Sequence, residues 1–129
     1  MKTKELHALQ GLAEVAFAAD QSKLAQINAQ EQAIRSQLDG LITERGQQGL
    51  AVTPGSAALK AGANVRWHRW IDHRRESLNR DLAATLAEKA RVIARVRQSF
   101  GKKEALTALV ARVRAAESQV KSRRRDQTS

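Results

Sequence analysis

The feature that most constrains this chain is a repeat of apolar residues at alternating steps of three and four. In the first half, the members of this seam are Leu6, Leu9, Ala13, Phe17, Leu24, Ile27, Ile34, Leu38 and Leu41, with Asp20 and Glu31 at intervening positions. A sustained repeat of this kind predicts a coiled-coil helix rather than a strand. One additional step of four near Ala13 predicts a stutter, which would locally relax the supercoil.

A second seam follows in the second half of the chain. Its members are Trp67, Ile71, Arg74, Leu78, Leu82, Leu86, Val92, Ile93, Val96 and Phe100, and then Leu106, Leu109, Val113, Ala116 and Val120. Gly101 interrupts this seam, and a glycine in a helix interior costs about 1 kcal/mol relative to Ala. A kink, a break and an uninterrupted helix are all compatible with the sequence at this residue.

The stretch between the two seams, residues 46–63, has the composition of a loop. It holds four of the seven glycines and the only proline. Pro54 presets φ and Gly55 tolerates a positive φ, so Thr53, Pro54 and Gly55 together predict a turn. Ser56 is suited to cap a short helical turn that Gly62 would close.

These patterns predict an all-α fold with a single coiled-coil domain over residues 1–129. We expect an antiparallel hairpin with a helix over about 4–45, the loop, and a longer helix over about 65–122 before a frayed basic tail. Thr3 and Asn64 are suited to the N-cap position and Gly46 to the residue after a helix.

A turn centred near Pro54 and Gly55 also predicts the register of the hairpin. Facing residues would then have numbers that add up to about 109. The expected pairings are Leu38 and Leu41 with Trp67 and Ile71, Phe17 with Val92, Ile93 and Val96, and Leu6 and Leu9 with Phe100 and Lys103. The first helix ends there, which leaves residues 106–120 as an apolar stripe without a partner. Because exposing such a stripe is unfavourable, we expect it to fold back at Gly101, self-associate or bind another protein.

The net charge of +10 is confined to the second half of the chain. Residues 1–63 contain six Lys or Arg and six Asp or Glu, whereas residues 64–129 contain seventeen and seven. The excess must face water or an acidic partner. The chain has no cysteine, no pattern of a secretory signal and no apolar run of the ~20 residues that span a bilayer, so we expect a cytoplasmic protein.

Catalytic and metal-binding patterns are not found. His68 and His73 are five residues apart rather than the four that place two imidazoles on one helical face. His68 and Asp72 do share a face, but a surface contact explains them. No phosphate-binding glycine loop and no nucleophile elbow are present. We therefore predict a binding module rather than an enzyme, with no cofactor and no metal.

One motif resembles a known family. The run Arg69, Trp70 and Ile71 follows a loop of Gly, Ala and Ser and precedes Leu78, Leu82 and Leu86. This layout is similar to that of the FliJ-type proteins of bacterial flagellar and type III secretion export. The resemblance implies an antiparallel coiled coil like the central stalk of rotary ATP synthases. It further implies that the free helix ends engage a hexameric export ATPase, that the region after the Trp-Ile pair contacts the export gate, and that export chaperones are escorted.

Three groups of residues are the candidates for partner contacts. They are Trp70, Ile71, Arg74, Arg75 and Leu78 after the loop, Leu106, Leu109, Val113 and Val120 on the stripe, and Arg123, Arg124 and Arg125 near the C-terminus. We expect Trp67 to close the coiled coil beneath the loop instead. The leading hypothesis is an adaptor that regulates the export ATPase at the export apparatus. The alternatives are a basic helical protein that binds nucleic acid and a structural coiled coil that self-associates through residues 106–120.

Overall fold

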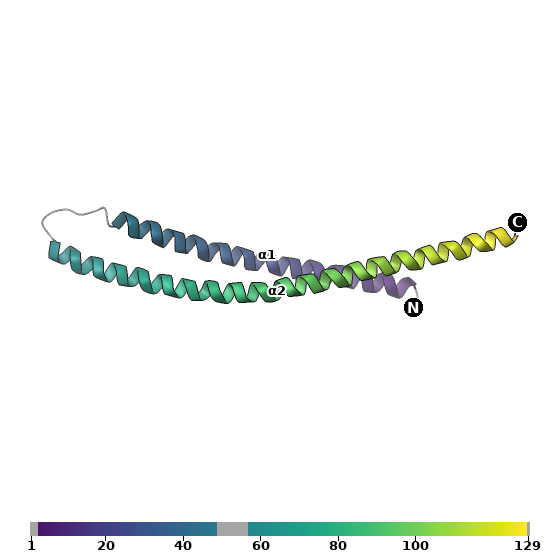
Figure 1. Ribbon diagram of the computed structural model, residues 1–129, viewed down its shortest axis with the longest axis horizontal. Helices are drawn as coiled ribbons and strands as arrows, with labels where there is room; N and C mark the ends of the chain where they lie inside the picture. The colour runs from purple at the N-terminus through teal and green to yellow at the C-terminus, as the bar shows by residue number, and fades with distance from the viewer. Residues whose placement is uncertain (1–2, 49–56, 129) are drawn as a thin grey trace. The chain divides into compact units, whose positions relative to one another are not determined.

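The computed structural model describes residues 3–48 and 57–128, with the side chains of 3–44 and 60–128. In these ranges the chain forms two α-helices, α1 (Thr3–Gln48) and α2 (Ala57–Thr128). The two helices run antiparallel and pack against each other, and α2 is the longer (Figure 1). The all-α helical hairpin predicted from the apolar repeat is therefore confirmed.

Both helices are longer than the cap signals predicted. Gly46 lies inside α1, and Gly62 and Asn64 lie inside α2, so none of them ends or begins a helix. Cap and glycine preferences are each about 1 kcal/mol or less, which a long helix packed on a partner readily offsets. The predicted turn at Pro54 and the predicted cap at Ser56 fall outside the described residues.

Two questions about α2 remain: whether Gly101 interrupts it, which the sequence left open, and whether its basic tail is frayed, as expected. α2 continues through Gly101, so there is no break. Gly101 is exposed, while Ser99 before it is buried and Lys103 after it is half-buried, so the helix is packed on both sides of the glycine. The three C-terminal arginines also lie within α2, where the Thr128 hydroxyl donates to the carbonyl of Arg124 at 3.0 Å.

The hairpin consists of two compact units. The terminal unit comprises Met1–Leu24 and Arg91–Ser129, and the central unit is Ala25–Ala90.

Three polar pairs define the register of the terminal unit. The Gln10 amide donates to the Thr107 hydroxyl at 3.2 Å, the Thr3 hydroxyl donates to the Glu117 carboxylate at 2.6 Å, and Arg114 lies 3.0 Å from His7 Nε2. In each pair the two residue numbers add up to between 117 and 121, not 109. The predicted register is therefore wrong in this unit, because each position of α1 faces a residue about ten positions further along α2 than predicted.

An aromatic pair agrees with this register. The ring centroids of Phe17 and Phe100 lie 5.5 Å apart, and the Lys103 ammonium lies 5.0 Å from the Phe17 centroid. Phe17 was expected to face Val92, Ile93 and Val96 instead. The apolar side chains Leu6, Val92 and Val110 are buried in the same unit.

The interhelical seam of α1 alternates steps of three and four without a stutter. Its half-buried and buried positions include Leu6, Gln10, Ala13 and Phe17, whereas Leu9 is 40% exposed. Gln10 thus occupies the seam position that the sequence analysis gave to Leu9. The predicted stutter is absent because a polar residue with a hydrogen-bond partner on α2 occupies the seam.

The core of the central unit is formed by Leu41, Ile71 and Leu78, and its half-buried neighbours are Ile34, Leu38 and Trp67. Leu38, Leu41, Trp67 and Ile71 were expected to meet, and their grouping is confirmed. Trp67 packs against this core, as a structural role requires.

A charged network lies beside this core. The Glu31 carboxylate is bonded by Lys89 at 2.8 Å and by Arg35 at 2.9 Å. These hydrogen bonds, first that from Lys89 and then that from Arg35, lower the pKa of Glu31 below its ordinary value. The seam position of Glu31 is therefore satisfied by a cation from α2.

Candidate partner-binding surfaces

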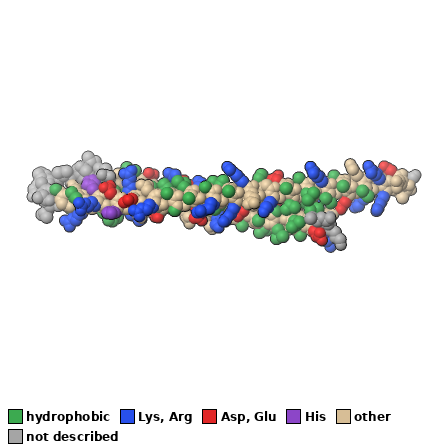
Figure 2. Space-filling model, turned by 60° about the horizontal axis from the view of Figure 1, so that its bottom comes forward, with side chains coloured by type: hydrophobic (Ala, Val, Ile, Leu, Met, Phe, Trp, Pro, Cys, Tyr) green, Lys and Arg blue, Asp and Glu red, His purple; other side chains and the backbone are tan. Residues whose placement is uncertain are grey.

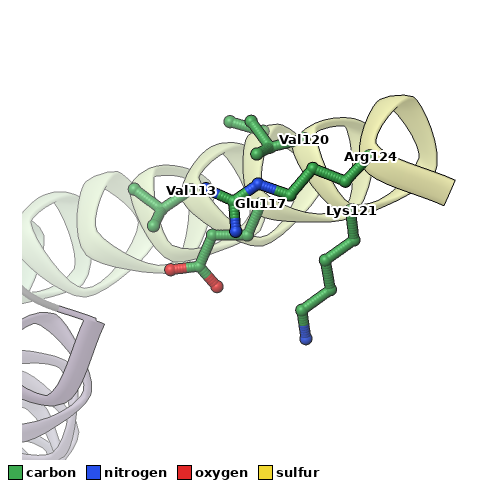
Figure 3. Close-up of a pocket in the computed structure, with 6 residues that line it drawn as sticks. Val113, Glu117, Val120, Lys121 and Arg124 are labelled. Atoms are coloured by element: carbon green, nitrogen blue, oxygen red, sulfur yellow. The ribbon is translucent and has the colours of Figure 1, made fainter. Parts of the chain in front are cut away.

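The most accessible candidate surface is the last part of α2. Every side chain from 114 to 128 is exposed. One side of this segment carries a groove of about 370 Å³, which we call the α2 groove (Figure 3). It is lined by Val113, Ala116, Glu117, Val120, Lys121 and Arg124.

The α2 groove continues the interhelical seam. The buried and half-buried positions Leu106, Val110 and Val113 are followed at steps of four, three and four by Glu117, Val120 and Arg124. The hydrogen bond between Thr3 and Glu117 joins the start of α1 to this part of α2, and every α2 side chain from 118 to 128 is exposed. The side of α2 that packs against α1 up to this point is therefore exposed over the last turns of α2.

The α2 groove has an apolar floor, and most of the charged side chains at its edge are cationic. In Figure 3 the Arg124 side chain runs back along α2 toward Glu117, and the Lys121 side chain points away from the helix. Side chains on a helix lean toward its N-terminus, which brings the Arg124 guanidinium over the valine positions. A helix with apolar residues at a similar spacing and acidic residues beside them fits this surface.

The charge around the α2 groove is strongly positive. Residues 91–128 contain eleven Lys or Arg and three Asp or Glu. Arg123, Arg124 and Arg125 are all exposed there. Such a field raises the association rate of an acidic partner and makes that rate depend on salt.

The predicted unpaired stripe over residues 106–120 requires a correction. Leu106 and Val113 are half-buried, and Val110 between them is only 4% exposed. In the observed register the first turns of α1 reach residues 107–117 of α2, so they accompany most of this stripe. Leu109 lies off the seam and is 41% exposed, and Val120 is 49% exposed.

The second candidate surface is the tryptophan region at the start of the central unit's α2 segment. The rings of Trp67 and Trp70 are stacked at 5.3 Å between centroids and 21° between planes. Trp70 is 51% exposed, while Ile71 and Leu78 are buried in the hairpin core. Those two residues are consequently not accessible to a partner of the intact hairpin.

The exposed part of this region is therefore Trp70 with two arginines. Arg74 donates to the Gln37 amide oxygen at 3.3 Å, and Arg75 is exposed beside it. Trp67 Nε1 and His68 Nδ1 are buried without a hydrogen-bond partner among the described residues. An aromatic side chain flanked by arginines has the composition of an interface.

No protein-family model, curated protein or solved structure matches this chain.

Two further observations concern other kinds of site. Over the described ranges, no group of three or more His, Asp or Glu side chains is arranged to hold a metal ion. Within the same ranges, neither helix is long and apolar enough to cross a membrane.

Two residues of the α2 groove were missed by the sequence analysis. Glu117 and Lys121 were not considered because the seam was traced through apolar residues only. Glu117 could have been found from the strict alternation of steps: the step of three from Val110 to Val113 is followed by a step of four, which leads to Glu117 rather than to Ala116.

Proposed function

We propose that this protein is a non-enzymatic coiled-coil adaptor that binds an acidic protein partner through the α2 groove. By its resemblance to FliJ-type proteins, the partner is a hexameric export ATPase, which the adaptor regulates without hydrolysing ATP itself. The observation that carries the proposal is the continuation of the interhelical seam into an exposed, basic groove. The chain would act in the cytoplasm, at the export apparatus.

The seam geometry specifies how such a partner would bind. Val113 and Val120 are seven residues apart, which is the spacing at which a second helix inserts its apolar residues. Burying an exposed valine side chain contributes up to about 1.5–3 kcal/mol. Acidic residues flanking the partner's seam would meet Lys121 and Arg124 and give specificity rather than most of the affinity.

Trp70, Arg74 and Arg75 form the second proposed contact. By the same resemblance, this surface would meet the export gate or an export chaperone. Ile71 and Leu78 are left out of this contact because they hold the hairpin together.

The test measures ATP turnover and hexamer formation of the cognate export ATPase with and without this protein. We expect the protein to change both, and the double variant Val120→Asp with Arg124→Glu to need at least ~10-fold more protein for the same effect, since it loses an apolar contact and inverts a charge. Val65→Asp is the matched control, because Val65 is a similarly exposed valine of α2 outside the groove. No change in turnover or hexamer formation with the unaltered protein would contradict the proposal.

A second candidate function is binding of nucleic acid without sequence preference. The excess of eight positive charges in residues 91–128 favours it. Anisotropy titrations of labelled duplex and single-stranded oligonucleotides at two salt concentrations decide the matter. Binding that weakens with salt, with a slope reduced by roughly 2–3 when Arg123, Arg124 and Arg125 are changed to Gln, would support it. No binding at low salt would exclude it.

A further inference from the structure

The N-terminal part of α1 carries a second seam that α2 does not cover. The residues Glu5, Leu9, Leu12, Ala16, Ala19 and Lys23 follow one another at steps of four, three, four, three and four, and every one is exposed. Leu12 at its middle is 67% exposed, and the exposed Val15 lies on its flank. This exposed seam lies within the terminal unit.

The exposed seam is distinct from the surface that packs on α2. The interhelical seam of the same segment uses Leu6, Gln10, Ala13 and Phe17. Figure 2 shows hydrophobic side chains gathered over the N-terminal part of α1. Beyond Lys23 the same spacing leads to Gln26 and Gln30, so the apolar part of the exposed seam is limited to residues 9–19.

The exposed seam is complementary to itself in the antiparallel direction. A two-fold axis at position 14 places Leu9 opposite Ala19 and Leu12 opposite Ala16 of a second copy. Each large side chain then faces a small one, which lets two helices approach closely. The same axis places Glu5 opposite Lys23, so opposite charges meet at both ends.

A parallel pairing would lack these features. Glu5 would face Glu5, and Lys23 would face Lys23. The local charge also favours a second copy at this face: Thr3–Leu24 contains two Lys and three Asp or Glu, whereas residues 91–128 carry a large positive excess. Self-association therefore meets less repulsion at the start of α1 than on the last part of α2.

We propose that two copies of this chain form a two-fold dimer through the exposed seams of their α1 helices, in antiparallel orientation. This proposal is independent of the adaptor function, because the dimer uses α1 and leaves the α2 groove open. Only four apolar residues of each copy meet, which is fewer than in a standard interface. The dissociation constant is accordingly expected on the order of micromolar.

Sedimentation of charge variants provides a test that depends on orientation. Glu5→Lys places two lysines opposite each other at both ends of the dimer, and Lys23→Glu does the same with glutamates. Each single variant should dimerise roughly tenfold more weakly. The double variant Glu5→Lys with Lys23→Glu should recover, and so should an equimolar mixture of the two single variants as a heterodimer.

The recovery separates pairing from helix stability. Glu5 lies in the first turn of α1, where its charge also suits the helix dipole, and the double variant keeps that loss. Recovery in the double variant therefore reports the pairing with Lys23. If both single variants and the double variant dimerise equally well, or if the mixture forms no heterodimer, the proposal is wrong.

Cross-linking gives an independent readout, since the chain has no cysteine. An equimolar mixture of Glu5→Cys and Lys23→Cys should form a covalent dimer with a short thiol-reactive reagent. Glu5→Cys alone should not, because two positions nine residues from the axis are about 27 Å apart at ~1.5 Å per residue. Efficient cross-linking of Glu5→Cys alone would indicate a parallel dimer and overturn the proposal.

Apolar variants locate the interface. Leu12→Asp should abolish the dimer without loss of helix content, since Leu12 is 67% exposed in the hairpin. Ile42→Asp is the control, as Ile42 is an exposed apolar residue of α1 outside the exposed seam. A dimer that survives Leu12→Asp but is lost in Leu109→Asp would assign self-association to residues 106–120 and contradict the proposal, as would a monomer at all accessible concentrations.

Discussion

Replacing Gly101 with alanine should stabilise the protein, although the sequence is compatible with a kink or a break there. Gly101 lies inside α2, and its backbone φ is not in the positive region that favours glycine. A Cβ built at this position meets no heavy atom within 4 Å. The added methyl group therefore neither clashes nor gains packing, and its effect is that of the backbone alone.

The magnitude follows from helix propensity. Glycine in a helix interior is about 0.5–1 kcal/mol less favourable than alanine, chiefly because the unfolded glycine has more conformations to lose. Gly11, Gly40 and Gly62 are also helical and equally open. Because the four positions share no contacts, their effects should add up to about 2–4 kcal/mol.

The assay is urea denaturation followed by circular dichroism at the helix band, with thermal unfolding as a second measure. Ala94→Gly, at an exposed position of the same helix, is the matched control and should destabilise by about 1 kcal/mol. If Gly101→Ala lowers the free energy of unfolding, then α2 needs a non-helical backbone at this residue and the account of Gly101 is refuted.

Three other predictions test the packing and its charges. Val110→Asp should lower the free energy of unfolding by at least ~3 kcal/mol because it buries a carboxylate, whereas the neighbouring Leu109→Asp should lower it by about 1 kcal/mol. Denaturation measures both, and equal effects would contradict the seam position of Val110. Ile71→Ala should lower the free energy of unfolding by about 2–4 kcal/mol and Ile42→Ala by under ~1 kcal/mol, since Ile71 is 1% exposed and Ile42 lies on the surface. Similar losses for the two variants would contradict the position of Ile71 in the core of the central unit. Glu31 has a lowered pKa in the folded state, so its contribution is present above the ordinary value of 4.5 and is lost as the pH falls through the lowered pKa. The stability difference between the wild type and Glu31→Gln should accordingly shrink in acid; a difference that grows in acid would contradict the assigned bonds.

The fold class could be predicted because the apolar repeat is long. Eight apolar residues from Leu6 to Leu41 keep the alternating steps of three and four in the first half alone, and no strand pattern competes with them. The meeting of Trp67 and Ile71 with Leu38 and Leu41 also followed from the repeat, because these residues lie close to the connection between the helices.

The exact seam could not be predicted from apolarity alone. At several positions a larger apolar residue was expected in the seam, and the structure places its smaller or more polar neighbour there. Gln10 replaces Leu9, Thr85 replaces Leu86, Ser99 replaces Phe100 and Val110 replaces Leu109. A strict alternation of steps governs burial, and hydrogen bonds such as that of Gln10 with Thr107 satisfy the polar members.

The exposure of the candidate partner-binding residues could be predicted only in part, because it depends on the seam and the register. Trp70, Arg74, Arg75, Val120 and the three C-terminal arginines are exposed as a contact surface requires. The burial of the other candidates depends on the register. The predicted register was shifted by about ten residues, so residues 106–113 were expected to lack a partner, whereas the first turns of α1 pack beside them. The exposed seam of α1 was missed because only one seam per helix was sought.

The register of the two helices determines which side chains form the core and which remain for partners. It is tested directly by paired cysteines joined with a short bifunctional thiol reagent in dilute monomer. Gln10→Cys with Thr107→Cys follows the observed contact, and Gln10→Cys with Ser99→Cys follows the register whose numbers add up to 109. The account predicts efficient intramolecular cross-linking of the first pair and little of the second. The opposite result would contradict it.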